Sequence, residues 1–191
     1  MENYKKNLKL LCKNHVYSSE MEHDACGVGL ISSTEGKKSR GVVEYGIEAL
    51  KAVWHRGAVD ADGKTGDGAG IHVEIPKDFF IEKIEVTGHD YDNSEICVGM
   101  IFLPRNDYSS QESCKTIVES ELTKNDFSIY GWRQVPVNPK ILGEKAFQTM
   151  PEIIQVLFKS NDPNLLDKDL ERKIYETRKK IENKAFDLSL N

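Results

Sequence analysis

The sequence predicts an α+β fold in which layered sheets are covered by helices on the outside. Several short segments are rich in apolar residues, either alternating with polar residues or in nearly continuous runs, as is typical of strands. Longer segments carry apolar residues at the three- and four-residue spacing of one helix face. Strands and helices are mixed along the chain without strict alternation, and this pattern favours layered sheets with helices outside.

The first half of the chain is predicted to start with a strand and a helix. Residues 26–33 (CGVGLISS) are typical of a strand. In the helix that follows, Val43, Ile47, Leu50 and Trp54 share one face. The predicted elements here are a strand at 26–33, a turn at 34–37, a helix at 40–55, a glycine-rich loop at 57–70, a strand at 71–75 and a short helix at 77–84.

The second half is predicted to contain three strands and two long helices. The apolar run 96–103 (ICVGMIFL) predicts a strand that is covered on both faces. A capping-box pattern, Ser109-x-x-Glu112, predicts the start of a helix with Cys114, Ile117, Val118 and Leu122 on its apolar face. The other predicted elements are strands at 127–135 and 153–158 and a charged helix at 165–186, with Leu166, Leu170, Ile174 and Ile181 on one face.

Composition restricts the class of protein. A chain of 191 residues suits one domain, and 39% hydrophobic with 30% charged residues is typical of a globular protein. The net charge of −5 gives no reason to expect nucleic acid or an anionic membrane as a partner, and no apolar run approaches the ~20 residues of a membrane span. The four cysteines are widely spaced, which predicts no metal site and fits reduced thiols in a cytoplasm.

Cys26 is the most informative residue of the chain. It follows Ala25 and precedes Gly27 and Gly29, a context that suits an amino-terminal nucleophile once the preceding peptide bond is cut. The freed α-amine, which titrates at about 7.7–8.0, can then act as the general base of the thiol. The alternative is a buried core cysteine, which is the commoner environment for a free thiol.

A second motif lies at residues 55–70, HRGAVDADGKTGDGAG. Its glycines let backbone approach a small polar ligand closely, and Arg56, just past a helix end, could bind a carboxylate. A flexible surface loop is the alternative interpretation. Calcium binding is disfavoured, because the acidic part lacks the glutamate that an EF-hand loop requires and position 69 is alanine.

Together the two motifs resemble a known family. The Cys26-Gly27-x-Gly29 start, the helix, His55-Arg56-Gly57 and the run TGDGAGI at 65–71 look like the class II glutamine amidotransferase domain that begins the large subunit of glutamate synthase. The resemblance runs through the whole chain and is strongest over residues 22–81. It implies an amino-terminal-nucleophile hydrolase fold, a four-layer α-β-β-α sandwich that is incomplete at the carboxyl end.

The resemblance also implies the site residues. Residues 1–25 would be a propeptide cleaved between Ala25 and Cys26, and 26–191 the first part of the amidotransferase domain. Cys26 would attack the side-chain amide of L-glutamine, form a glutamyl thioester and release ammonia. Arg56 would hold the site beside the nucleophile. The remaining residues expected to line or support the substrate site are Gly57, Gly66, Asp67 and Gly68.

The resemblance further implies what lies outside this chain. FMN and an iron–sulfur cluster belong to other domains of a complete glutamate synthase, so no cofactor is expected here; the remaining synthase domains or a small subunit are possible partners. The Asn-Gly pair that forms the family's oxyanion hole does not occur in these residues. Because losing one oxyanion donor costs about 10²–10³ in rate, we expect little activity from this chain alone.

Two other interpretations stay open at this point. The chain could be a non-catalytic fragment or interaction module that keeps the start of the fold without its chemistry. It could also be part of another class II amidotransferase, such as one acting on a phosphoribosyl or sugar-phosphate substrate. The TGDGAGI run favours glutamate synthase over this last class.

Overall fold

The computed structural model describes residue 6 and residues 27–54, 57–188 and 190. The chain forms two compact units. The first contains the described residues up to Val59 together with Gly66–Ile71, and the second contains Asp60–Thr65 and the chain from His72 onward. The architecture is a mixture of helices and one small antiparallel sheet, so the α+β class predicted from the sequence is confirmed.

The second unit is built on a three-stranded antiparallel sheet. Its strands are β1 (Cys97–Leu103), β2 (Phe127–Gln134) and β3 (Glu152–Ser160), in the order β1-β3-β2. In the registers, Gly99 faces Val156 across β1 and β3, and Trp132 faces Val156 across β2 and β3. All three strands were predicted from their apolar runs. Strand β3 comes last in the sequence but lies in the middle of the sheet. Its five consecutive buried residues are therefore flanked by a strand on each side.

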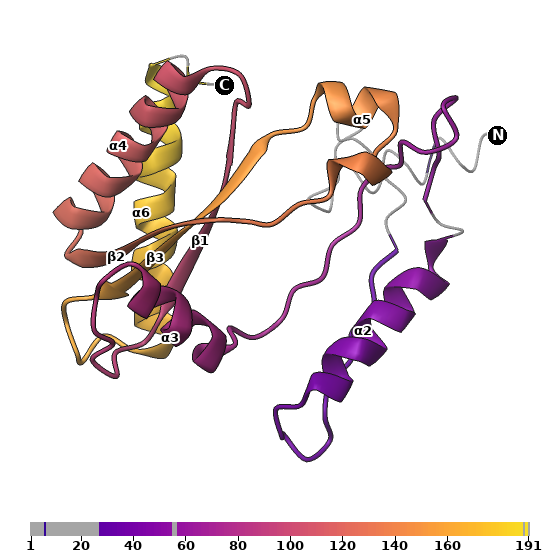
Figure 1. Cartoon of the computed structure of the whole chain (residues 1–191). Helices are drawn as coiled ribbons and strands as arrows, with labels where there is room; N and C mark the ends of the chain where they lie inside the picture. Colours follow the sequence, from indigo (N-terminus) through magenta and orange to yellow (C-terminus); the bar gives the residue numbers. More distant parts are fainter. Residues whose placement is uncertain (1–5, 7–26, 55–56, 189, 191) are drawn as a thin grey trace. The chain divides into compact units, whose positions relative to one another are not determined.

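Two long helices, α4 (Tyr108–Lys124) and α6 (Asp167–Asp187), lie side by side on one face of the sheet (Figure 1). The core beneath them contains aliphatic and aromatic side chains from both helices and all three strands. Its buried members are Cys97, Val118, Leu122, Phe127, Val156, Phe158 and Leu170. A buried carboxylate, Glu121 of α4, pairs with Lys184 of α6, and this hydrogen bond is the largest effect lowering the pKa of Glu121.

The opposite face of the sheet is covered only in part. Helix α3 (Lys77–Val86) packs Phe80 and Ile84 against Tyr130 and Leu157. Along β1, however, Met100 is 50% and Phe102 62% exposed. The prediction that β1 is covered on both faces is therefore wrong for the described part of the chain.

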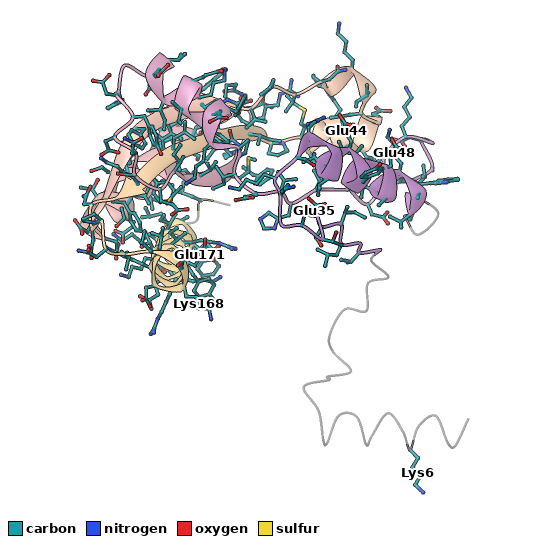
Figure 2. All side chains as sticks on the ribbon, turned by 90° about the horizontal axis from the view of Figure 1, so that it is seen from below. Lys6, Glu35, Glu44, Glu48, Lys168 and Glu171 are labelled. Atoms are coloured by element: carbon teal, nitrogen blue, oxygen red, sulfur yellow. The ribbon has the colours of Figure 1, made fainter. Side chains whose placement is uncertain are left out.

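The first unit is organised around helix α2 (Arg40–Ala52). The Ser39 hydroxyl caps it by accepting a hydrogen bond from the Val42 N–H. Glu44 and Glu48 lie along one side of α2 (Figure 2), where they pair with Arg40 and Lys51. The helix ends three residues earlier than predicted, and Trp54, expected on its apolar face, is exposed.

Two predicted strands do not form. Residues 27–33 and 71–75 are extended but belong to no sheet, and Val28 and Leu30 are 90% and 89% exposed. Alternation of apolar and polar residues predicts which face of a strand is buried, but a strand also needs a hydrogen-bonding partner, and the described residues supply none for these segments. The four-layer sandwich is accordingly not present in the described residues, which contain a single sheet.

Two local predictions in the second half also need correction. Helix α4 begins at Tyr108 and is capped by Asp107, whose carboxylate accepts from the Ser110 N–H at 3.0 Å, so the predicted capping box at Ser109 is wrong. A short segment that the sequence did not predict contains the 3₁₀ helix η2 (Pro139–Ile141) and the helix α5 (Glu144–Gln148). Among the described residues, no helix has both the length and the apolar composition needed to cross a membrane.

Candidate functional site

The predicted site residues divide into two groups. Ala25, Cys26 and Arg56, with its neighbour His55, lie outside the described residues. Gly57, Gly66, Asp67 and Gly68 are described, and all four belong to one hairpin-like loop that runs from residue 57 to residue 68. The described geometry of the site is therefore the geometry of this loop.

The base of the loop is closed by backbone contacts. Val59 and Gly66 form an isolated antiparallel bridge. The Asp67 carboxylate accepts a hydrogen bond from the Ala58 N–H at 2.8 Å, and the Gly57 N–H donates to the carbonyl of Trp54 at 3.0 Å. Asp67 thus holds the two arms of the loop together by binding the backbone of Ala58.

Gly68 has a backbone conformation that favours glycine. Its φ is +90°, in a region that residues with a Cβ rarely adopt. Gly57 and Gly66 have no such requirement, and a Cβ on either would meet its neighbours at ordinary contact distances. Among the predicted glycines, Gly68 therefore has the clearest structural reason to be glycine.

The tip of the loop, residues 60–65, is a tight turn built around Asp62. One oxygen of the Asp62 carboxylate accepts from the N–H groups of Lys64 and Thr65 at 2.9 and 2.7 Å, and the other accepts from the Thr65 hydroxyl at 2.6 Å. These bonds, led by the Thr65 hydroxyl, hold the pKa of Asp62 well below its usual range. The carboxylate is therefore ionised at neutral pH and is occupied by bonds within the chain.

The turn is also fastened to a distant part of the second unit. The Lys145 ammonium donates to the Asp60 carboxylate at 2.6 Å, and the Ala146 N–H donates to the Thr65 hydroxyl oxygen at 3.4 Å. No local pattern in the sequence predicts this segment. A glycine at Gly143 followed by Glu144 is a weak helix start, and the side chains that complete it come from about eighty residues earlier in the chain.

The acidic residues of the loop do not converge. Asp60 faces Lys145, Asp62 faces its own turn, and Asp67 faces the Ala58 N–H. In the part of the chain that the structure describes, no group of three or more His, Cys, Asp or Glu side chains is arranged to hold a metal ion. The three carboxylates of the loop are thus engaged within the protein, one by an ion pair with Lys145 and two by hydrogen bonds from the loop itself.

The loop and the chain around it match a known family. Residues 26–190 match the model of the glutamine amidotransferases class-II, so the matched region begins at Cys26 itself. The chain belongs to the class II glutamine amidotransferases. The family is enzymatic, and the resemblance inferred from the two sequence motifs is confirmed at this level.

Individual relatives of this amidotransferase chain are glutamate synthases. It is 51% identical over 179 residues to the glutamate synthase [NADPH] large chain of Azospirillum brasilense, which covers 94% of this chain and 12% of the relative. It is 42% identical over 162 residues to ferredoxin-dependent glutamate synthase 1, chloroplastic/mitochondrial, of Arabidopsis thaliana, covering 84% and 10%. For the ferredoxin-dependent glutamate synthase of Pyropia yezoensis, identity is 38% over 175 residues, covering 91% and 11%.

The chain therefore spans about a tenth of the length of these relatives. Their similarity confirms the resemblance to the amidotransferase part of the glutamate synthase large chain. It also favours this assignment over the other class II amidotransferases that the sequence left open.

Proposed function

We propose that this chain is the glutamine-hydrolysing part of a glutamate synthase, with Cys26 as its nucleophile. The observation that carries the proposal is that the family match begins at Cys26, the residue that would become the amino terminus. Residues 1–25 would then be a propeptide that is removed before the enzyme acts. Because a free α-amine titrates at about 7.7–8.0, the new amino terminus would be an effective base near neutral pH.

The proposed reaction has two halves. The Cys26 thiol gives its proton to its own α-amine while the sulfur attacks the carboxamide carbon of L-glutamine. The amine returns the proton to the departing nitrogen, which leaves as ammonia, and a glutamyl thioester remains. Water then attacks the thioester, a proton passes back through the amine to the sulfur, and glutamate is released.

Arg56 and the loop at 57–68 would bind and orient the substrate beside the nucleophile. A guanidinium suits a carboxylate, because it can donate two parallel hydrogen bonds. Gly66, Asp67 and Gly68 would bring backbone N–H and C=O groups close to the glutamine, with Asp67 holding the loop closed through Ala58.

We further propose that the complete domain has the four-layer α-β-β-α fold of amino-terminal-nucleophile hydrolases. Support comes from apolar surface that the described residues leave uncovered: Val28 and Leu30 in one extended segment, Val73 in another, and Phe102 on the open face of the sheet. Gathered into one patch, such apolar surface would be unusual on a finished domain. Pairing of the two extended segments into a second sheet stacked on the first would bury it.

The cofactors of a complete glutamate synthase would be bound elsewhere. Among the residues that the structure describes, the cysteines do not fit an iron–sulfur cluster: Cys97 is buried in the sheet core, Cys114 lies on α4, and no group of three or more His, Cys, Asp or Glu side chains gathers around either. We propose that ammonia passes to separate synthase domains that carry FMN and the cluster, in a cytoplasmic enzyme of ammonia assimilation. No step of the glutaminase reaction requires either group.

A chimera tests the proposed function. Residues 1–191 would replace the matching segment of the Azospirillum brasilense large chain, and glutamate formation would be measured with glutamine or with ammonia as nitrogen source. We expect glutamine-dependent activity and an amino terminus at Cys26 by intact-mass measurement. Cys26→Ala should lower the glutamine-dependent rate by several orders of magnitude and leave the ammonia-dependent rate unchanged. A Cys26→Ala chimera that still uses glutamine would overturn the proposal.

A further inference from the structure

Residues 143–146 make contacts that reach beyond their own short helix. The Asp60 carboxylate of the turn accepts a hydrogen bond from the Lys145 ammonium. Thr65 accepts one from the N–H of Ala146. Gly143, the residue before α5, provides no side-chain cap, and the Thr65 hydroxyl oxygen accepts from one free N–H at the start of α5, that of Ala146.

The contact is too close to admit any other residue at position 143. A Cβ placed on Gly143 would lie 2.6 Å from the backbone nitrogen of Thr65 and would also overlap the side chains of Asp62 and Thr65. Real Cβ atoms essentially never approach backbone so closely. The φ of Gly143 is −70°, which any residue can adopt, so the close approach is what requires glycine here.

The ion pair between Lys145 and Asp60 adds a second attachment on the other arm of the turn. Its two charged atoms are 2.6 Å apart, and the Asp60 side chain is about one-third exposed. The backbone N–H of Asp60 also donates a hydrogen bond to the Thr65 carbonyl at 2.8 Å, which closes the turn. Both arms of the turn are thus attached to the 143–146 segment.

We propose that Gly143 and Lys145 are positioning residues for the glutamine site. They fix the turn at 60–65, and the chain continues from Thr65 directly into Gly66, Asp67 and Gly68. Displacing Thr65 therefore displaces the part of the loop that the proposed function assigns to the substrate, and in this respect the inference rests on that function. Neither residue is proposed to act on the reacting atoms, so their effect should be on substrate binding and orientation.

Hydrogen exchange on the 191-residue chain tests the attachment without any need for activity. Lys145→Ala and Gly143→Ala should accelerate exchange of the Lys64 and Thr65 amides at least about tenfold, because the bonds that hold the turn are lost. Amides of α4 and β3 should keep their protection, which shows that the fold is intact. Lys145→Arg should retain most of the protection.

Matched control variants distinguish loss of the contacts between the turn and residues 143–146 from the general effect of removing a lysine or adding a methyl group. Lys140→Ala removes an exposed lysine from the same segment, and Gly41→Ala adds a methyl group where the nearest atom is 3.7 Å away. Both should leave exchange at 58–67 unchanged. In an Asp60→Ala background, Lys145→Ala should have less effect than in the parent chain, because their ion pair is already broken.

Kinetics of the chimera test the positioning role. Lys145→Ala should raise the KM for glutamine several-fold with a smaller effect on kcat, and ammonia-dependent activity should not change. Unaltered exchange at the turn in both Gly143→Ala and Lys145→Ala would overturn the inference while leaving the glutaminase proposal standing. Faster exchange with unchanged glutamine kinetics would overturn the positioning role. A parent chimera that cannot use glutamine would overturn the proposed function, and the positioning role with it.

Discussion

Asp92 shows how one side chain can fasten a loop to a sheet. Its carboxylate accepts a hydrogen bond from the Tyr130 hydroxyl at 2.9 Å, pairs with Lys159, and accepts from the Ser94 N–H at 3.2 Å. The hydrogen bond from Lys159 is the largest effect holding the pKa of Asp92 well below its usual range, followed by bonds from Ser94 and Tyr130. The polar loop at 87–95 is in this way attached to β2 and β3.

This arrangement predicts a stability that depends on pH. Since the pKa of Asp92 is lower in the folded than in the unfolded state, its contribution is fully present above about pH 4 and is lost as the pH falls further. Asp92→Asn should therefore lower stability at pH 7 and weaken the decline of stability below about pH 4, as measured by urea unfolding. Tyr130→Phe should cost about 1 kcal/mol at pH 7. An Asp92→Asn chain with the parent's pH profile would contradict this account.

At the scale of elements, the two faces of the sheet differ in how they are covered. Helices α4 and α6 cover one face, whereas α3 covers only the end of the other that includes Leu157. Leu157 on the central strand is fully buried, and Phe102 on the edge strand β1 is 62% exposed on the same face. Burial on this face is therefore set by the helix above each position.

A pair of truncations measures that difference. Leu157→Ala should destabilise the chain by about 2–5 kcal/mol, because it leaves a cavity under α3. Phe102→Ala should change stability by less than about 0.5 kcal/mol, since most of its ring is already in water. Urea unfolding of both variants provides the measurement. A large loss from Phe102→Ala would show that this end of the face is covered in solution.

At the scale of the whole molecule, burial makes the thiols of the described cysteines unreactive. Cys97 is 4% exposed, and burial raises the pKa of its thiol to about 12. Burial also raises the pKa of the Cys114 thiol. Thiols in these environments are protonated at neutral pH and are poor nucleophiles.

Thiol labelling of the folded chain should therefore discriminate among its four cysteines. With iodoacetamide at pH 7.5 we expect Cys26 to be modified much faster than Cys97 and Cys114, and all to react after unfolding in urea. Peptide mapping by mass spectrometry gives the order of modification, and Cys26→Ala serves as the control. Fast native labelling of Cys97 would contradict the burial described above.

Local pattern was sufficient for much of this protein. Strands β1, β2 and β3 were predicted from their apolar runs, and helices α2, α4 and α6 from the spacing of their apolar residues. These predictions were possible because strand and helix periodicity depends on residues that are close in the sequence. The resemblance of the Cys26, HRG and TGDGAGI motifs to those of a known family was enough to indicate the family. The motif glycines predicted a loop, and two of them, Gly63 and Gly68, have a positive φ that favours glycine.

Other features were decided by contacts between residues far apart in the sequence. Residues 27–33 and 71–75 have strand patterns but lack partners among the described residues, and a strand forms only when another completes its hydrogen bonds. Helix α5 is too short to be stable by propensity, and one of its free N–H groups, that of Ala146, is satisfied by the Thr65 hydroxyl. The sequence by itself determined the family and most elements; the tertiary structure decided which segments pair and what fastens the site loop, because those bonds join residues that no local pattern connects.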